Sequence, residues 1–118
     1  MDLQGVDASL MENAKRASDF LKAVANENRL IILCALSQGE KNVGQLEEIL
    51  SIRQPTLSQQ LSRLRSEGLV KTRRVSKQIY YRITSDEALE LVGLVYDLFC
   101  SNQKQTGAGK EVSPAAVG

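Results

Sequence analysis

The sequence predicts a mostly α-helical fold with a small β-hairpin, an α+β arrangement in the order ααααββα. Three observations support this fold class. Apolar residues recur at helical spacing over residues 10–67, period-two alternation replaces that spacing over residues 69–84, and an unusually apolar helix follows from Asp86. A chain of 118 residues that is 42% hydrophobic and 25% charged is long enough for one domain with its own core.

Two helices are expected before the basic part of the chain. Residues 10–25 carry an amphipathic stripe at spacings of four and three, formed by Leu10, Ala14, Ala17, Leu21 and Val24. Residues 28–37 are apolar at nearly every position and predict a short helix that is buried on all sides. Gly39 then favours the left-handed backbone conformation that commonly ends a helix, and a polar turn follows over residues 40–42.

The next two helices are separated by a tight turn. Asn42 is a good N-cap for a third helix that ends near Ser51, with its apolar side chains on one face. Proline is favoured in a first helical turn and disfavoured in an interior, so Pro55 places a fourth helix directly after a turn at residues 51–54. Spacings of four and three predict that its apolar side chains face inward, namely Leu57, Leu61 and Leu64.

The outer face of this fourth helix suits contact with the edges of DNA bases. It presents Gln59, Ser62, Arg63 and Ser66, flanked by Thr56 and Ser58, and it contains no acidic residue. In the major groove glutamine matches adenine and arginine matches guanine. An ordinary exposed polar face is the alternative, although surface helices usually mix charges of both signs.

A hairpin is expected after Gly68. Residues 69–75 and 78–84 are rich in β-branched and aromatic side chains, and the second stretch alternates apolar with polar residues. Its tip lies near residues 75–77 and lacks the glycine typical of the tightest turns. The hairpin is basic and therefore suited to phosphate contacts, through Arg73, Arg74 and Lys77 above all. A helix-turn-helix followed by such a hairpin is a winged helix-turn-helix.

Charge is strongly segregated along the chain. Residues 53–82 hold eight Lys and Arg against one Glu, a net charge of +7, whereas the remainder holds seven basic and thirteen acidic residues, a net charge of −6. A basic segment on an otherwise acidic domain indicates a polyanionic partner. A solvated charged face is the alternative reading.

The last helix is expected from Asp86 to about Ser101. Its polar positions cover less than a third of the helix circumference. The apolar surface that remains is wider than the stripe that a helix needs to pack on a single core. A second copy of the chain would bury the surplus, so we expect a homodimer. The domain organisation predicted is a flexible N-terminus over residues 1–9, one domain over 10–101 and a disordered tail over 102–118.

The composition excludes most enzyme and metal-site classes. Because the chain has no histidine and only two cysteines, it can form neither a histidine-dependent nucleophile nor a four-ligand zinc site. No glycine-rich phosphate loop occurs, and we expect no catalysis, cofactor or metal. The longest apolar run, residues 30–36, is far shorter than the roughly 20 residues that span a bilayer. Without a signal-peptide pattern, the chain is expected in the cytoplasm, with free thiols.

The segments QPTLSQQLSRLRSEGLV and TRRVSKQIYYRIT, in this order of elements, resemble the ArsR family of bacterial repressors over about residues 12–102. The resemblance implies that the helix at residues 54–67 enters the major groove of operator DNA, that the hairpin contacts the flanking backbone, and that the terminal helices form a dimer. The residues expected to bind DNA are Gln54, Thr56, Ser58, Gln59, Ser62, Arg63, Arg73, Arg74 and Lys77.

The two cysteines add a further resemblance. One lies in RLIILCAL and the other in VYDLFC, a combination similar to the persulfide-responsive SqrR/BigR/HlyU branch of the family. That resemblance implies that a persulfide or polysulfide inducer links Cys34 to Cys100 and releases DNA. Cys100 is expected to be the more accessible thiol, with Lys104 one turn on, and Cys34 the harder to ionise.

Two alternatives to a thiol switch remain at this stage. Buried cysteine often serves as a small hydrophobic side chain, so the protein is alternatively a DNA-binding repressor without a sensor. A thiol oxidoreductase belongs to a different functional class and typically uses a Cys-X-X-Cys pair, which the sequence lacks.

Overall fold

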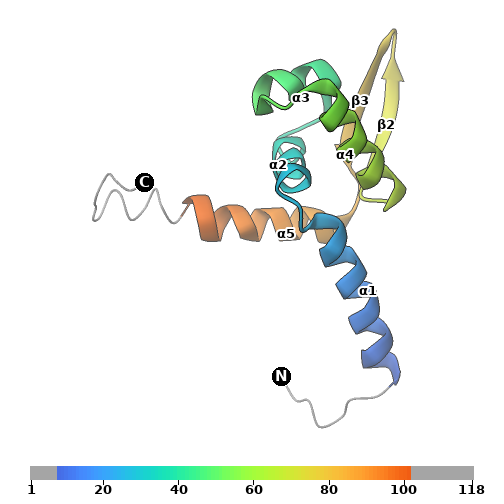
Figure 1. Ribbon diagram of the computed structural model, residues 1–118. Helices are drawn as coiled ribbons and strands as arrows, with labels where there is room; N and C mark the ends of the chain where they lie inside the picture. The colour runs from blue at the N-terminus through green and yellow to red at the C-terminus, as the bar shows by residue number, and fades with distance from the viewer. Residues whose placement is uncertain (1–7, 102–118) are drawn as a thin grey trace, which may run out of the picture.

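The computed structural model describes residues 8–101. Residues 1–7 of the flexible N-terminus expected over residues 1–9, the tail expected over 102–118 and the side chain of Lys104 lie outside the described residues. Four helices precede a hairpin and a fifth helix follows it, which confirms the winged helix-turn-helix (Figure 1). The elements are α1 (Ala8–Val24), α2 (Glu27–Leu36), β1 (Lys41–Asn42), α3 (Val43–Leu50), α4 (Gln54–Ser66), β2 (Val70–Val75), β3 (Gln78–Ile83), α5 (Asp86–Tyr96) and η1 (Asp97–Ser101).

The helix-turn-helix of α3 and α4 is set by local sequence. Asn42 and Gln45 form a capping box, in which each side chain accepts a hydrogen bond from the other residue's backbone N–H. Ser51 closes α3 in the left-handed conformation, with φ of 57°. Pro55 lies in the first turn of α4. The expected cap is confirmed, and α4 begins at Gln54, one residue before the predicted start.

The core lies between α2, α3 and α4. Leu57, Leu61 and Leu64 of α4 are completely buried, as are Ile32 and Leu33 of α2 and Leu46 of α3. Burying a leucine side chain contributes about 1.5–3 kcal/mol. The inward-facing stripe predicted for the fourth helix is therefore correct, and it determines which face of α4 remains exposed.

The sheet has one strand more than the sequence predicts. β1 pairs with β3 in an antiparallel three-stranded sheet of order β1-β3-β2, with Lys41 opposite Tyr81 and Asn42 opposite Tyr80. The predicted order ααααββα omits β1, and the turn expected over residues 40–42 is partly strand. Two residues are too few to display a period of two, so only the pairing with β3 defines this strand.

The hairpin formed by β2 and β3 follows the predicted strand bounds closely. Val70 pairs with Ile83 at its base and Val75 with Gln78 at its tip, so the turn consists of Ser76 and Lys77. Ser76 takes the positive φ of 58° that glycine usually supplies. The tip is therefore a two-residue turn without glycine.

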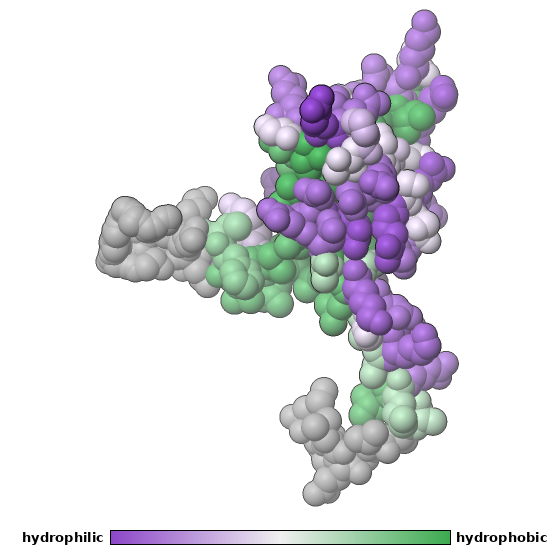
Figure 2. Space-filling model, in the orientation of Figure 1, coloured by the Kyte–Doolittle hydropathy of each residue, from purple (hydrophilic) through white to green (hydrophobic). Residues whose placement is uncertain are grey.

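The helices at the two ends of the chain extend away from the core. α1 begins at Ala8, two residues before the predicted start, and buries only Ala23 and Val24, whereas Leu21 of the predicted stripe is 51% exposed. α5 is continued by a π-helical turn, η1, that the sequence did not predict. Figure 2 shows apolar surface along α5, opposite a largely polar surface over α3, α4 and the hairpin. No helix within residues 8–101 is long and apolar enough to cross a membrane.

We expect Leu57→Ala to lower the free energy of unfolding by about 2–5 kcal/mol, because the substitution leaves a cavity in a completely buried site. Its exposed neighbour provides the matched control: Ser58→Ala is expected to change stability by less than about 0.5 kcal/mol. Urea denaturation without DNA measures both variants. Equal effects of the two substitutions would contradict the burial that orients α4.

Candidate nucleic-acid interface

The outer face of α4 is a continuous polar surface. Of the six predicted residues on this helix, Thr56 is half-buried and the others are exposed, namely Gln54, Ser58, Gln59, Ser62 and Arg63. They project outward because the leucine stripe points inward. Figure 1 shows α3, α4 and the hairpin at the same end of the molecule, and the corresponding surface in Figure 2 is strongly hydrophilic.

One predicted residue of α4 has an acidic partner. Arg63 Nε lies 3.1 Å from a carboxylate oxygen of Glu67, the residue that follows the helix. Both side chains are well exposed, and exposed ion pairs of this type contribute little to stability. Arg63 therefore lies in the last turn of α4 beside a negative charge, whereas Gln54, Thr56, Ser58 and Gln59 occupy its first half.

The basic residues of the hairpin do not share one environment. Arg74 and Lys77 are exposed near the tip. Arg73 instead donates hydrogen bonds to both carboxylate oxygens of Glu40, at 2.7–2.9 Å, and its guanidinium carbon lies 5.9 Å from the centre of the Tyr80 ring. Because successive side chains of a strand point to opposite faces, Arg73 and Arg74 are directed to different sides of the hairpin.

The Arg73–Glu40 contact alters the acidity of both groups. The hydrogen bond from Arg73 lowers the pKa of Glu40; burial opposes this shift, and the charges of Arg73 and Arg82 add to it. Glu40 in turn raises the pKa of Arg73. Bidentate pairing of this kind fixes the orientation of the guanidinium as well as its charge. Glu40 therefore connects the chain before β1 to the middle of the hairpin.

The two cysteines lie on neighbouring helices and are free thiols. Cys34 of α2 is half-buried, and Cys100 of η1 is exposed, as the sequence predicts. Burial raises the pKa of the Cys34 thiol, and the negative charge of Cys100 raises it further. Both effects disfavour the thiolate form of Cys34, in the direction that the sequence predicts.

Cys34 also borders an open groove between α2, α3 and α5, together with Ala35, Leu50, Val92 and Tyr96. Within residues 8–101 no three His, Cys, Asp or Glu side chains lie close enough together to hold a metal ion.

Sequence reasoning missed three residues that the fold brings to this region. Glu40 binds Arg73 across 33 positions, and Arg29 of α2 binds Gln60 of α4 across 31 positions. No local spacing predicts contacts over such separations. The surplus positive charge of the hairpin indicated that an acidic residue elsewhere in the chain would pair with it, without indicating which one.

Comparison with known proteins gives a consistent assignment. Residues 26–72 match the family described as bacterial regulatory protein, arsR family. The chain is 46% identical over 94 residues to the biofilm growth-associated repressor of Xylella fastidiosa. The aligned region covers 80% of this chain and 82% of that protein.

Solved structures agree with that result. The structure of the transcriptional repressor BigR from Xylella fastidiosa superposes with a TM-score of 0.73 at 45% identity. The superposition covers 80% of this chain and 98% of the BigR chain. The structure of reduced HlyU from Vibrio cholerae superposes with a TM-score of 0.75 at 40% identity. The superposition covers 78% of this chain and 97% of the HlyU chain.

We expect the Glu40 carboxyl group to titrate below its ordinary pKa and to return toward that value in Arg73→Gln, which removes the bidentate donor. Because the folded-state pKa is depressed, the stability that this contact contributes is present above the ordinary pKa of glutamate and is lost as the pH falls through the folded-state value. Carboxyl-carbon NMR measures the titration. Arg74→Gln, on the other face of the hairpin, should leave it unchanged, and an equal effect of both substitutions would contradict a specific contact.

Proposed function

Because the chain belongs to the ArsR family of bacterial regulatory proteins, we propose that it represses transcription in the cytoplasm by binding operator DNA, and that a persulfide or polysulfide releases it. The observation that carries the DNA-binding part is the exposed, hydrogen-bonding face of α4 beside a basic hairpin at one end of the molecule. Repression is supported by the relatives named repressors, although HlyU of Vibrio cholerae is named an activator.

In the proposed complex α4 lies in the major groove and the hairpin follows the backbone. Gln59, Ser62 and their exposed neighbours provide donors and acceptors for base edges. Arg74 and Lys77 provide positive charge for phosphates, which positions the protein without reading sequence. Arg73 points to the opposite side of the hairpin from Arg74, and it can contact a phosphate only by sharing its donors with Glu40.

A homodimer is proposed from the apolar surface that one chain leaves exposed. Leu89, Leu94 and Phe99 are 42%, 53% and 68% exposed on α5 and η1, and Leu21 of α1 is exposed as well. Large apolar side chains that remain exposed together on one helix commonly mark a protein interface. A twofold dimer would place two copies of α4 on two half-sites, so the expected operator is an imperfect palindrome.

The release mechanism is proposed from the two thiols. Cys34 lies in the helix that packs against α4, and Cys100 lies at the end of the apolar α5 surface. Joining them through additional sulfur atoms would tie the core to the proposed dimer interface and shift the spacing of the two α4 helices. The two electrons that the thiols lose reduce the inducer, whose remaining sulfur leaves as a thiol or hydrogen sulfide. The electrostatic effect of Cys100 on Cys34 supports their proximity.

We expect Gln59→Ala to relax sequence preference at particular base pairs, at about 1–3 kcal/mol for each lost base contact. Lys77→Ala should instead weaken all sequences alike and reduce the slope of log affinity against log salt by about one, since it removes a phosphate contact. Electrophoretic mobility shift, with a duplex that the wild-type protein selects from random DNA, measures the base preference and the salt dependence of both variants. The shifted complex should contain two protein chains. Altered base preference in Lys77→Ala alone would reverse the proposed roles.

We expect a persulfide donor to abolish operator binding by the wild-type protein and a reductant to restore it, with both thiols required. Cys34→Ser and Cys100→Ser should each bind DNA when reduced and remain bound after treatment, although a hydroxyl at position 34 costs about 1–3 kcal/mol of stability. Intact mass should reveal one intramolecular link with added sulfur. Normal release of either single variant would favour the alternative in which the cysteines only pack.

A further inference from the structure

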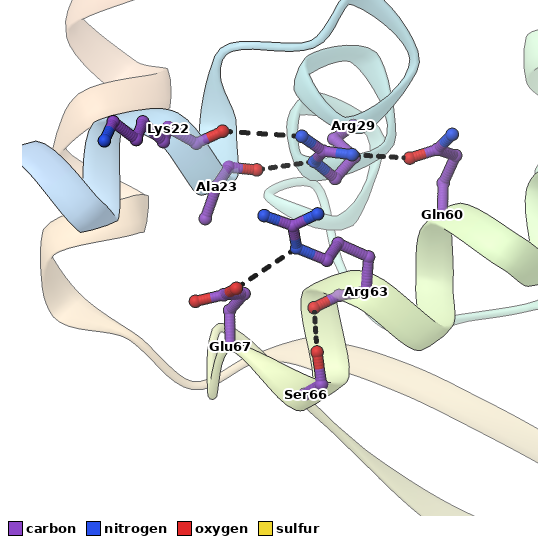
Figure 3. A network of polar contacts seen from close by, with 7 residues as sticks. All are labelled: Lys22, Ala23, Arg29, Gln60, Arg63, Ser66 and Glu67. Atoms are coloured by element: carbon purple, nitrogen blue, oxygen red, sulfur yellow. Dashed lines mark hydrogen bonds and ion pairs between the residues drawn. The ribbon is translucent and has the colours of Figure 1, made fainter.

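Arg29 joins three helices at the corner behind α4. The Asn26 side chain accepts a hydrogen bond from the Arg29 backbone N–H at 3.0 Å, which caps α2 and places Arg29 in its first turn. From there Arg29 Nε donates to the Ala23 carbonyl at 2.6 Å, and one terminal nitrogen donates to the Lys22 carbonyl at 3.4 Å. The other terminal nitrogen donates to Gln60 Oε1 at 2.8 Å (Figure 3).

The chemistry of this contact favours one fixed geometry. The last carbonyl groups of α1 have no partner within their own helix, and the guanidinium satisfies two of them while its positive charge complements the end of the helix dipole. The planar fork holds its acceptors in defined directions. Partial burial lowers the pKa of Arg29, and the nearby charge of Arg63 lowers it further.

Gln60 lies at the edge of the buried side of α4. It is half-buried, one residue from the exposed Gln59 and one from the buried Leu61. Apolar burial through the leucine stripe is non-directional and leaves α4 some freedom to roll. A hydrogen bond is directional, so the Arg29–Gln60 contact restricts that rotation. A small roll of α4 would displace every side chain on its outer face.

We propose that Arg29 is a positioning residue for α4: by joining the end of α1 to Gln60, it sets the rotation of α4 and thereby the sequence discrimination of the protein. The inference rests on the proposed DNA-binding function. Neither Arg29 nor Gln60 is needed as a direct DNA contact. Through Arg29 of α2, the corner also links α4 to α1, most of whose apolar stripe is exposed.

The test compares binding to a duplex selected from random DNA by the wild-type protein with binding to a scrambled duplex of the same composition. For Arg29→Met we expect the ratio of the two affinities to fall about tenfold, the scale of losing one hydrogen bond to a charged group. The salt dependence should stay unchanged, since no phosphate contact is lost. Arg16→Met removes an exposed positive charge from α1 and should leave the ratio as in the wild type.

Two variants of Gln60 keep the proposal testable if Arg29→Met fails to fold. Gln60→Leu removes the acceptor and should reduce the ratio, whereas Gln60→Glu retains an acceptor of the same length and should preserve the ratio even if its charge weakens binding to both duplexes. Urea denaturation of all variants measures stability separately.

Several outcomes would overturn the proposal. A salt slope reduced by about one in Arg29→Met would make Arg29 a direct phosphate contact. Lower stability with an unchanged affinity ratio would limit Arg29 to a structural role. If the wild-type protein selects no sequence at all, the proposed function itself fails, and that result is distinguishable because it precedes any substitution.

Discussion

The rest of the structure depends on the burial of one leucine stripe. Leu57, Leu61 and Leu64 are completely excluded from solvent against α2 and α3, so α4 has a single inward face. That constraint decides which face of α4 is presented to a partner, and the Arg29–Gln60 hydrogen bond restricts the rotation that remains. The chain then reverses at Gly68, with φ of 77°, and Leu69 and Val70 enter the same core, which places the hairpin beside α4.

Polar and apolar surfaces are separated by this arrangement. Residues 53–82 concentrate positive charge on α4 and the hairpin, while five of the ten large exposed apolar side chains within residues 8–101 lie on α5 and η1. Part of the charge is already compensated within the chain, because Glu40 binds Arg73 and Glu67 binds Arg63. The hairpin tip and the first half of α4 are consequently the surfaces best suited to a polyanion. The half-buried Cys34 lies in α2, between that end and the apolar helix.

Local signals explain which parts of the fold were predictable. Asn42 and Pro55 act on their own turns, and the leucine spacing of α4 repeats within one helix, so each was visible in a short window of sequence. β1 was not predicted because two residues carry no period. The stripe on α1 was recognised, but most of it lies away from the core of its own chain. Amphipathic spacing indicates that the apolar face of a helix will be buried, but it does not identify the surface that packs against that face.

By itself, the sequence determined the order of the five helices and the hairpin, the inward face of α4, the basic character of the hairpin and the relative exposure of the two thiols. All of these depend on residue type and spacing within short stretches of the chain. Only the tertiary structure decided that Arg73 binds Glu40 and that Arg29 joins α1 to Gln60. The physical reason is that such hydrogen bonds join atoms from distant positions, and only the packing of α2 against α4 and of β1 against β3 brings those atoms together.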